Sequence, residues 1–191
     1  MKFSTGIIGI SSTSLSSPRG IVSGPNSSTM DIISGIPGSP TPPVPFNPNN
    51  GIGLTTDLSG TSSAVGPKNR GTVKLLNVTT PAVTGSQNTA LGSVDSVSIS
   101  GNMVAAGSNN NSAMFLINFA SPTTPQISNH ITLTGAGGWT VVLNASPIQL
   151  ITGDLNGFDV NFLSVTTNAV GKPAATLVKS VNSGVARSPP V

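Results

Sequence analysis

A short apolar run recurs four times along this chain of 191 residues, and the copies are almost evenly spaced. The copies begin at Met30, Val73, Met114 and Val160, so their starts lie 43, 41 and 46 residues apart. Self-similarity with a fixed period of this size indicates one supersecondary unit that buries its apolar face by stacking on copies of itself. The repeat therefore constrains the architecture strongly, but it does not name a chemistry.

The residues around the runs favour strands and turns over helices. Glu is absent and charged residues make up only 7% of the chain, while Gly, Pro, Ser, Thr and Asn fill the gaps between β-branched runs. In the third copy, 94–99 alternates between apolar and polar residues, Gly101 and Asn102 supply a hairpin turn, and 103–106 is the next strand. Three antiparallel strands are therefore predicted up to the end of the third apolar run, and the fourth copy repeats them.

A fourth strand is predicted after each of the later runs. The segments 84–90, 127–134 and 174–181 are polar and alternating, and each follows a proline that presets a turn. Four strands in a repeat of about 40 to 45 residues are typical of the blades of a β-propeller. The sequence therefore predicts an all-β, propeller-like array of about four small antiparallel blades.

We expect these blades to form a single repeat domain. The predicted units are 1–36, 37–80, 81–122 and 123–170, with 171–191 starting or closing a further blade. Two arrangements are open for the ends of the array. Either a first strand at Ile7 to Ile10 closes the ring by pairing with the C-terminal segment, or the chain is an incomplete or fragmentary propeller.

The N-terminal third is less regular than the rest. The proline-rich stretch 35–48 cannot donate to a central ladder, so we expect the second unit to have lost a strand to a loop. The segment 57–71 is rich in Gly and Ser and is predicted to be a long loop, ending in Lys68, Asn69 and Arg70. Long loops tend to carry function, so we expect these three residues to contact an acidic or polysaccharide partner.

Two segments resemble the repeat of a bacterial β-propeller family. In 75–81 (LLNVTTP) and 116–122 (LINFASP), apolar residues precede a polar residue and a turn that ends in proline, as in that family's Leu-Val-Ile-Val-Asp signature. The family's Asp position is occupied here by Ser34, Asn77, Asn118 and Ser164. The resemblance implies a scaffold that is displayed on a surface or secreted, with no common catalytic set.

Composition argues against several classes of protein. Without Cys, a disulfide framework, a thiolate nucleophile and a Cys-based zinc site are all impossible. The net charge of +3 is scattered, Tyr is absent and there is one Trp, so a nucleic-acid interface is not expected. No apolar run approaches the roughly 18 to 20 residues of a membrane span, and the N-terminus is a poor signal peptide.

Candidate catalytic groups are few. His130 is the only histidine, and a triad would require an acid to orient it and a nucleophile beside it, so we expect it to be an exposed structural residue. The segment 154–159 has oxygen ligands at alternate positions but lacks the remaining carboxylates of a calcium loop, so a hairpin turn is favoured. No cofactor and no metal are expected. The five acidic residues are Asp31, Asp57, Asp95, Asp154 and Asp159.

These observations favour a non-enzymatic scaffold or interaction module, extracellular or at the cell surface, with a protein or polysaccharide partner. One alternative is a structural subunit of a filament, appendage or viral particle, which self-associates through open strand edges. A second alternative is a glycan-active hydrolase or lyase that uses Asp57, Asp154 and Asp159 on loops.

Overall fold

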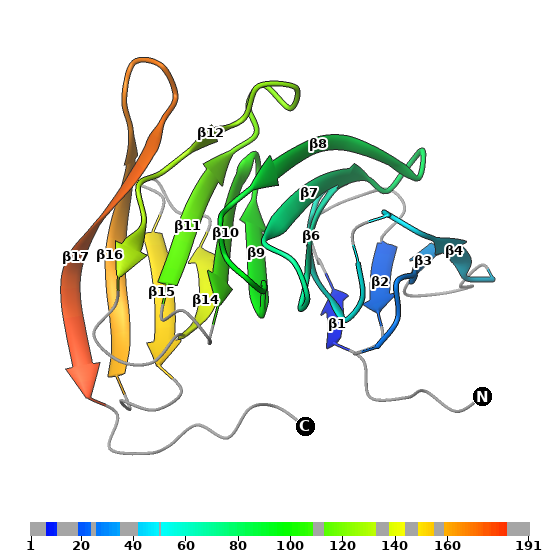
Figure 1. Cartoon of the computed structure of the whole chain (residues 1–191), viewed down its shortest axis with the longest axis horizontal. Coiled ribbons are helices and arrows are strands. Elements are labelled where there is room, and N and C mark those ends of the chain that lie inside the picture. Colours follow the sequence, from blue (N-terminus) through cyan, green and yellow to red (C-terminus); the bar gives the residue numbers. More distant parts are fainter. Residues whose placement is uncertain are drawn as a thin grey trace.

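The computed structural model describes residues 7–10, 19–23, 26–34, 42–49, 51–108, 113–132, 138–143, 149–154 and 159–182. Within these ranges the regular structure is entirely β, in four antiparallel sheets that follow one another along the chain. Figure 1 shows the sheets side by side in an arc, with the first and the fourth at its two ends. The predicted all-β propeller-like array of four blades is confirmed.

The first two sheets each have four strands in sequence order. The strands of the first sheet are β1 (Ile7–Ile10), β2 (Arg19–Ser23), β3 (Met30–Ser34) and β4 (Val44–Phe46). The strands of the second sheet are β5 (Leu54–Ser59), β6 (Ser62–Pro67), β7 (Thr72–Asn77) and β8 (Ala82–Asn88).

The third and fourth sheets repeat this topology. The strands of the third sheet are β9 (Ser96–Ser100), β10 (Met103–Ser108), β11 (Ala113–Asn118), β12 (Gln126–Ile127) and β13 (Ile131–Thr132). The two short strands β12 and β13 share one place, because both pair with β11. The strands of the fourth sheet are β14 (Gly138–Leu143), β15 (Gln149–Asp154), β16 (Asp159–Thr167) and β17 (Pro173–Asn182).

All four apolar runs form the third strand of a sheet, namely β3, β7, β11 and β16. The segments that follow a proline supply the fourth strand, as predicted. The sheets divide the chain at points other than the predicted unit boundaries, because each fourth strand belongs to the sheet of the run before it. The segment 171–191 accordingly contributes β17 to the fourth sheet.

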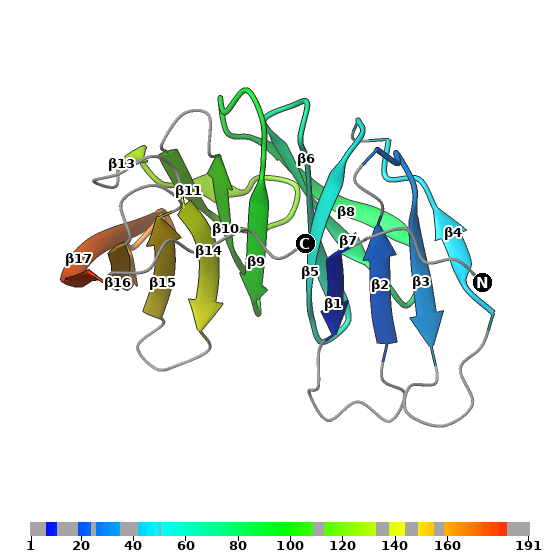
Figure 2. The ribbon, with the colours of Figure 1, turned by 90° about the horizontal axis from the view of Figure 1, so that it is seen from below.

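Three apolar clusters hold the arc together, one between each pair of consecutive sheets. Ile21, Met30 and Ile32 of the first sheet pack on Leu54, Leu58 and Val65 of the second. The other face of the second sheet packs on the third, and Phe119 is the largest buried side chain there. Met103, Met114 and Leu116 of the third sheet meet Leu150, Leu163 and Val165 of the fourth. Figure 2 shows the same four sheets from below, again in chain order from one end of the arc to the other.

Two predictions about the N-terminal third are wrong. The segment 57–71 is not a long loop: it completes β5, turns at Gly60, runs back as β6 and ends in a short turn before β7. The second sheet has not lost a strand, and Val44–Phe46 near the end of the proline-rich stretch form β4 of the first sheet instead. Pro45 is tolerated because β4 is an edge strand, where a missing N–H can face away from the ladder.

Ring closure, one of the two arrangements that the sequence left open, is not formed by the described residues. Strand β1 pairs with β2, and β17 pairs with β16, and neither pairs with the other. The residues after Asn182 lie outside the described ranges. The described residues also contain no helix that is long and apolar enough to cross a membrane.

Candidate functional site

A groove of about 630 Å³ lies between the third and fourth sheets. One wall is the segment that leads into β13, and the other is the hairpin that joins β16 to β17. The polar residues that line it include Ser128, Asn129, His130, Thr132, Asn168 and Lys172. We call this cavity the polar groove.

A hydrogen bond joins the two walls of the polar groove. The Lys172 ammonium donates to Oδ1 of Asn129 at 2.9 Å, across 43 residues of sequence. On the hairpin side, Oδ1 of Asn168 accepts from the backbone N–H of Lys172 at 2.9 Å and that of Val170 at 3.1 Å, which closes the turn. Gly171 lies in this turn with a φ of +79°, a conformation that glycine adopts without steric cost.

The hairpin is also attached to the third sheet. The side-chain amide of Asn118, at the end of β11, donates to the carbonyl of Gly171 at 2.9 Å. Asn118 is the polar residue that ends the third apolar run. The polar residue after the apolar run thus positions one wall of the polar groove.

The His130 imidazole lies exposed on the other wall. Its ring centroid is 5.4 Å from that of Phe115, with the planes tilted by 50°, and its Nδ1 lies 3.3 Å from the Thr132 hydroxyl. The residues that line the polar groove include no Asp. Since a His-based nucleophilic mechanism requires an acid to orient the base, this lining can bind a ligand through hydrogen bonds but does not assemble a triad.

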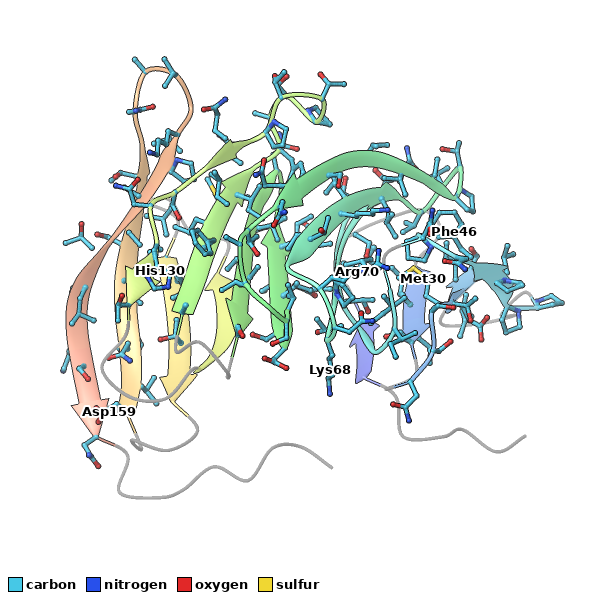
Figure 3. The ribbon with its side chains drawn as sticks, in the orientation of Figure 1. Met30, Phe46, Lys68, Arg70, His130 and Asp159 are labelled. Atoms are coloured by element: carbon cyan, nitrogen blue, oxygen red, sulfur yellow. The ribbon has the colours of Figure 1, made fainter. Side chains whose placement is uncertain are left out.

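The three residues that the sequence singled out lie together on the turn between β6 and β7. Lys68, Asn69 and Arg70 are all exposed. The turn is fixed to the segment before β5: the backbone N–H of Lys68 donates to the carbonyl of Gly53 at 3.1 Å, and Oδ1 of Asn69 accepts from the backbone N–H of Ile52 at 3.1 Å. Figure 3 shows the Lys68 and Arg70 side chains apart from one another, so the turn offers two separate cations.

Lys74 does not add a free cation to this turn. Its ammonium donates to the carbonyls of Pro48 and Asn49, both at 2.8 Å. Burial and the nearby Arg70 guanidinium hold the pKa of Lys74 below its ordinary value of 10.5. The Lys74 ammonium therefore links β7 of the second sheet to the segment that follows β4 of the first.

The acidic residues proposed for a glycan-active enzyme lie on two different sheets. Asp57 accepts hydrogen bonds from β9 of the third sheet, whereas Asp154 and Asp159 end β15 and begin β16 of the fourth. Figure 3 places Asp159 well away from His130. Among the described residues no three His, Cys, Asp or Glu side chains gather as a metal site would require, and residues 155–158 of the calcium-like segment lie outside the described ranges.

The polar groove was missed by reasoning from sequence. Its residues come from segments around positions 130 and 170. In the sequence, these two segments are interpreted as separate strands with no link between them. The available local signal was the turn at Asn168 and Gly171. Nothing local indicates that this turn lies against the third sheet.

Solved structures share this fold at low sequence identity. The Pan2 WD40 domain of Neurospora crassa matches with a TM-score of 0.57 and 11% identity, over 92% of this chain and 59% of that one. Kluyveromyces lactis Hsv2 matches with a TM-score of 0.53 and 16% identity, over 82% of this chain and 46% of that one.

Computationally designed proteins match similarly. The Ika4 protein matches with a TM-score of 0.57 and 12% identity, over 84% of this chain and 86% of that one. The Ika8 protein matches with a TM-score of 0.56 and 12% identity, over 81% of this chain and 44% of that one. This chain thus spans about half the length of Ika8, Pan2 and Hsv2.

No protein-family model matches the chain, and no curated protein matches it. At these identities the solved structures establish the fold alone, a propeller-like array of antiparallel sheets.

Proposed function

We propose that the chain is a non-enzymatic interaction module that binds a segment of a partner protein in the polar groove. The observation that carries this proposal is the lining of the groove, which presents hydroxyl, amide, imidazole and ammonium groups without a carboxylate. Such a lining suits an extended segment with free backbone groups and an acidic or neutral polar side chain. The propeller fold supports the proposal, because propellers serve widely as scaffolds for binding.

Lys172 gives the polar groove its charge preference. The ammonium is held beside Asn129 at the junction of the two walls, so an acidic side chain of the partner gains a charge-assisted hydrogen bond there. The turn at Lys68 and Arg70 is the second candidate contact, with exposed cations but without a cavity. That the chain acts outside the cytoplasm is supported only by its resemblance to surface propeller repeats.

The two contacts can be separated with a displayed library of random 12-residue peptides panned on the wild-type chain. We expect selected peptides to be enriched in Asp and Glu and to bind the Lys172→Glu variant at least tenfold more weakly than wild type, measured by fluorescence anisotropy. The Lys68→Glu variant is the matched control, since it makes the same charge change outside the groove, and binding to it should be unchanged. Circular dichroism confirms that both variants fold.

Two results would overturn the proposal. If Lys68→Glu loses the peptides and Lys172→Glu keeps them, the turn is the contact and the polar groove is not. If neither variant changes the affinity, neither basic surface is the binding site.

A further inference from the structure

Among the described residues, the two sheets inside the arc are covered on both faces, whereas the two sheets at its ends are covered on one. Residues that alternate along a strand point to opposite faces, so each sheet has an earlier face and a later face along the chain. In the third sheet, Val104 and Ala106 pack back on the second sheet, and Met103 and Ala105 pack forward on the fourth. Every internal interface therefore joins the later face of one sheet to the earlier face of the next.

The later face of the fourth sheet is apolar and carries a cation. Leu150, Leu163 and Val165 point to the third sheet, so Ile151, on β15, and Phe162, on β16, project from the other face, where they are cross-strand partners. Phe162 and Val181 line a hollow of about 410 Å³ there, together with Lys179. Val181 pairs with Val160 and is 40% exposed.

The earlier face of the first sheet is the counterpart. Ile21, Met30 and Ile32 point to the second sheet, so Val22, Asp31 and Ile33 project from the opposite face. Val22 and Ile33 are half-buried, and Asp31 is exposed between them. This face therefore offers apolar side chains around one anion, where the later face of the fourth sheet offers apolar side chains around one cation.

We propose that a second copy of this chain covers both faces, with the fourth sheet of each copy stacked on the first sheet of the other. The contact would repeat the later-to-earlier pattern of the three internal interfaces, and it would oppose Lys179 to Asp31. Two such contacts, related by a two-fold axis, close eight sheets into one ring. Propellers of roughly four to eight blades are known, so a ring of this size lies within the range of the fold.

The length of matching structures supports the same arrangement. The four sheets match 44% of Ika8 and 46% of Hsv2, so these two structures are about twice as long as this chain, whereas the match covers 59% of the Pan2 domain and 86% of Ika4. A second copy would supply the further length that the two longer structures have, without requiring another protein. The interface is made by sheet faces and not by the strand edges through which self-association was expected from the sequence.

Light scattering coupled to size-exclusion chromatography tests the proposal on the 191-residue chain, whose mass is 19.0 kDa. We expect twice this mass for the wild type at micromolar concentration. Asp31→Lys and Lys179→Asp should each raise the dimer dissociation constant at least tenfold, and the double variant that carries both should recover the dimer, because it restores opposite charges at both contacts. Phe162→Glu should give a monomer with an unchanged β spectrum by circular dichroism.

Two control variants test whether a charge change outside the proposed interface would also dissociate the dimer. Lys68→Asp makes the same charge reversal on the turn between β6 and β7, and Val170→Asp introduces a charge at a side chain that is 71% exposed in the hairpin between β16 and β17. Both should remain dimers. A wild-type monomer at 100 µM, an open series of larger masses, or failure of the double variant to recover the dimer would overturn the closed ring of two copies.

Discussion

The Asp57 carboxylate accepts a hydrogen bond from the Ser98 hydroxyl at 2.8 Å, across the boundary between the second and third sheets. The same oxygen accepts from the backbone N–H of Ile99 at 2.8 Å, and the other oxygen accepts from that of Leu58 at 2.8 Å. Within the described part of the chain, β9 pairs with β10 alone, so its inner edge has no strand partner. Asp57 therefore satisfies an edge that would otherwise leave a backbone N–H unpaired.

We expect Asp57→Ala to destabilise the fold by about 2 to 3 kcal/mol, because it leaves the partly buried Ile99 N–H without its acceptor and removes two further bonds. Urea unfolding should show a lower midpoint with the same slope. Ser86→Ala is the control, since this exposed serine on β8 should shift the midpoint by less than about 0.5 kcal/mol. Equal midpoints for the two variants would show that Asp57 does not stabilise the junction.

Gly71, directly before β7, packs against the segment that joins β8 of the second sheet to β9 of the third. Its carbonyl accepts from the backbone N–H of Thr89 at 2.9 Å, and a Cβ atom at this glycine would lie 1.8 Å from the carbonyl oxygen of Leu91. Because this oxygen belongs to the backbone, it cannot move aside unless the segment that joins β8 to β9 is displaced. We expect Gly71→Ala to destabilise the fold by about 3 kcal/mol or more.

The comparison for this variant is Gly60→Ala, in the hairpin between β5 and β6. Gly60 has a φ of +60° and open space around it, so alanine there adds only the backbone cost of about 1 to 2 kcal/mol. Thermal unfolding of both variants measures the difference. If Gly71→Ala destabilises the chain no more than Gly60→Ala, the segment at Leu91 can move to make room, and the close approach does not constrain the fold.

The period and the third strands could be predicted because they depend on local sequence. Residues 73–78 and 114–119 each place large apolar side chains on both faces of a strand that lies between two sheets, which gives a dense run. The hairpin of β5 and β6 could not be predicted in this way. Ser63, Ala64 and Val65 are fully buried there, and close packing between two sheets selects small residues that resemble a loop in composition.

The candidate site depends on contacts that no local pattern contains. Asn129 and Lys172 meet across 43 residues, and Asp57 meets Ile99 across 42. Lys68, Asn69 and Arg70 lie together on one turn because they are neighbours in the chain. The sequence could not show that Lys74 turns its ammonium to Pro48 and Asn49 instead.

Lys74 predicts a pH dependence of stability. Burial, and secondarily Arg70, lower the pKa of Lys74 in the folded chain, so the unfolded chain binds more protons between that lowered pKa and 10.5. The contribution of Lys74 to stability therefore rises as the pH rises through this window, and this rise should be absent in Lys74→Met when urea midpoints are compared from neutral to alkaline pH.

An NMR titration gives the direct check on the cause. In Arg70→Gln the pKa of Lys74 should move up towards 10.5 without reaching it, because burial is the larger cause and is unchanged. The matched variant Lys68→Gln, on the same turn, should leave it in place. A Lys74 that titrates at 10.5 in the wild type contradicts the effect of burial.

Thr152 and Asn161 are cross-strand partners on β15 and β16, and each is 1% exposed on the face that meets the third sheet. The Thr152 hydroxyl has no hydrogen-bond partner within the described structure, whereas the Ser63 hydroxyl, which is equally buried, donates to the Asp57 carbonyl at 2.8 Å.

An unsatisfied buried hydroxyl costs free energy that a methyl group does not, so Thr152→Val should leave stability unchanged or raise it by up to about 1 kcal/mol. Ser63→Ala should lower it by about 1 to 2 kcal/mol, because the carbonyl of Asp57 loses a donor. Urea unfolding of the two variants side by side measures both signs, and a loss in Thr152→Val as large as that in Ser63→Ala would show that the Thr152 hydroxyl is bonded after all.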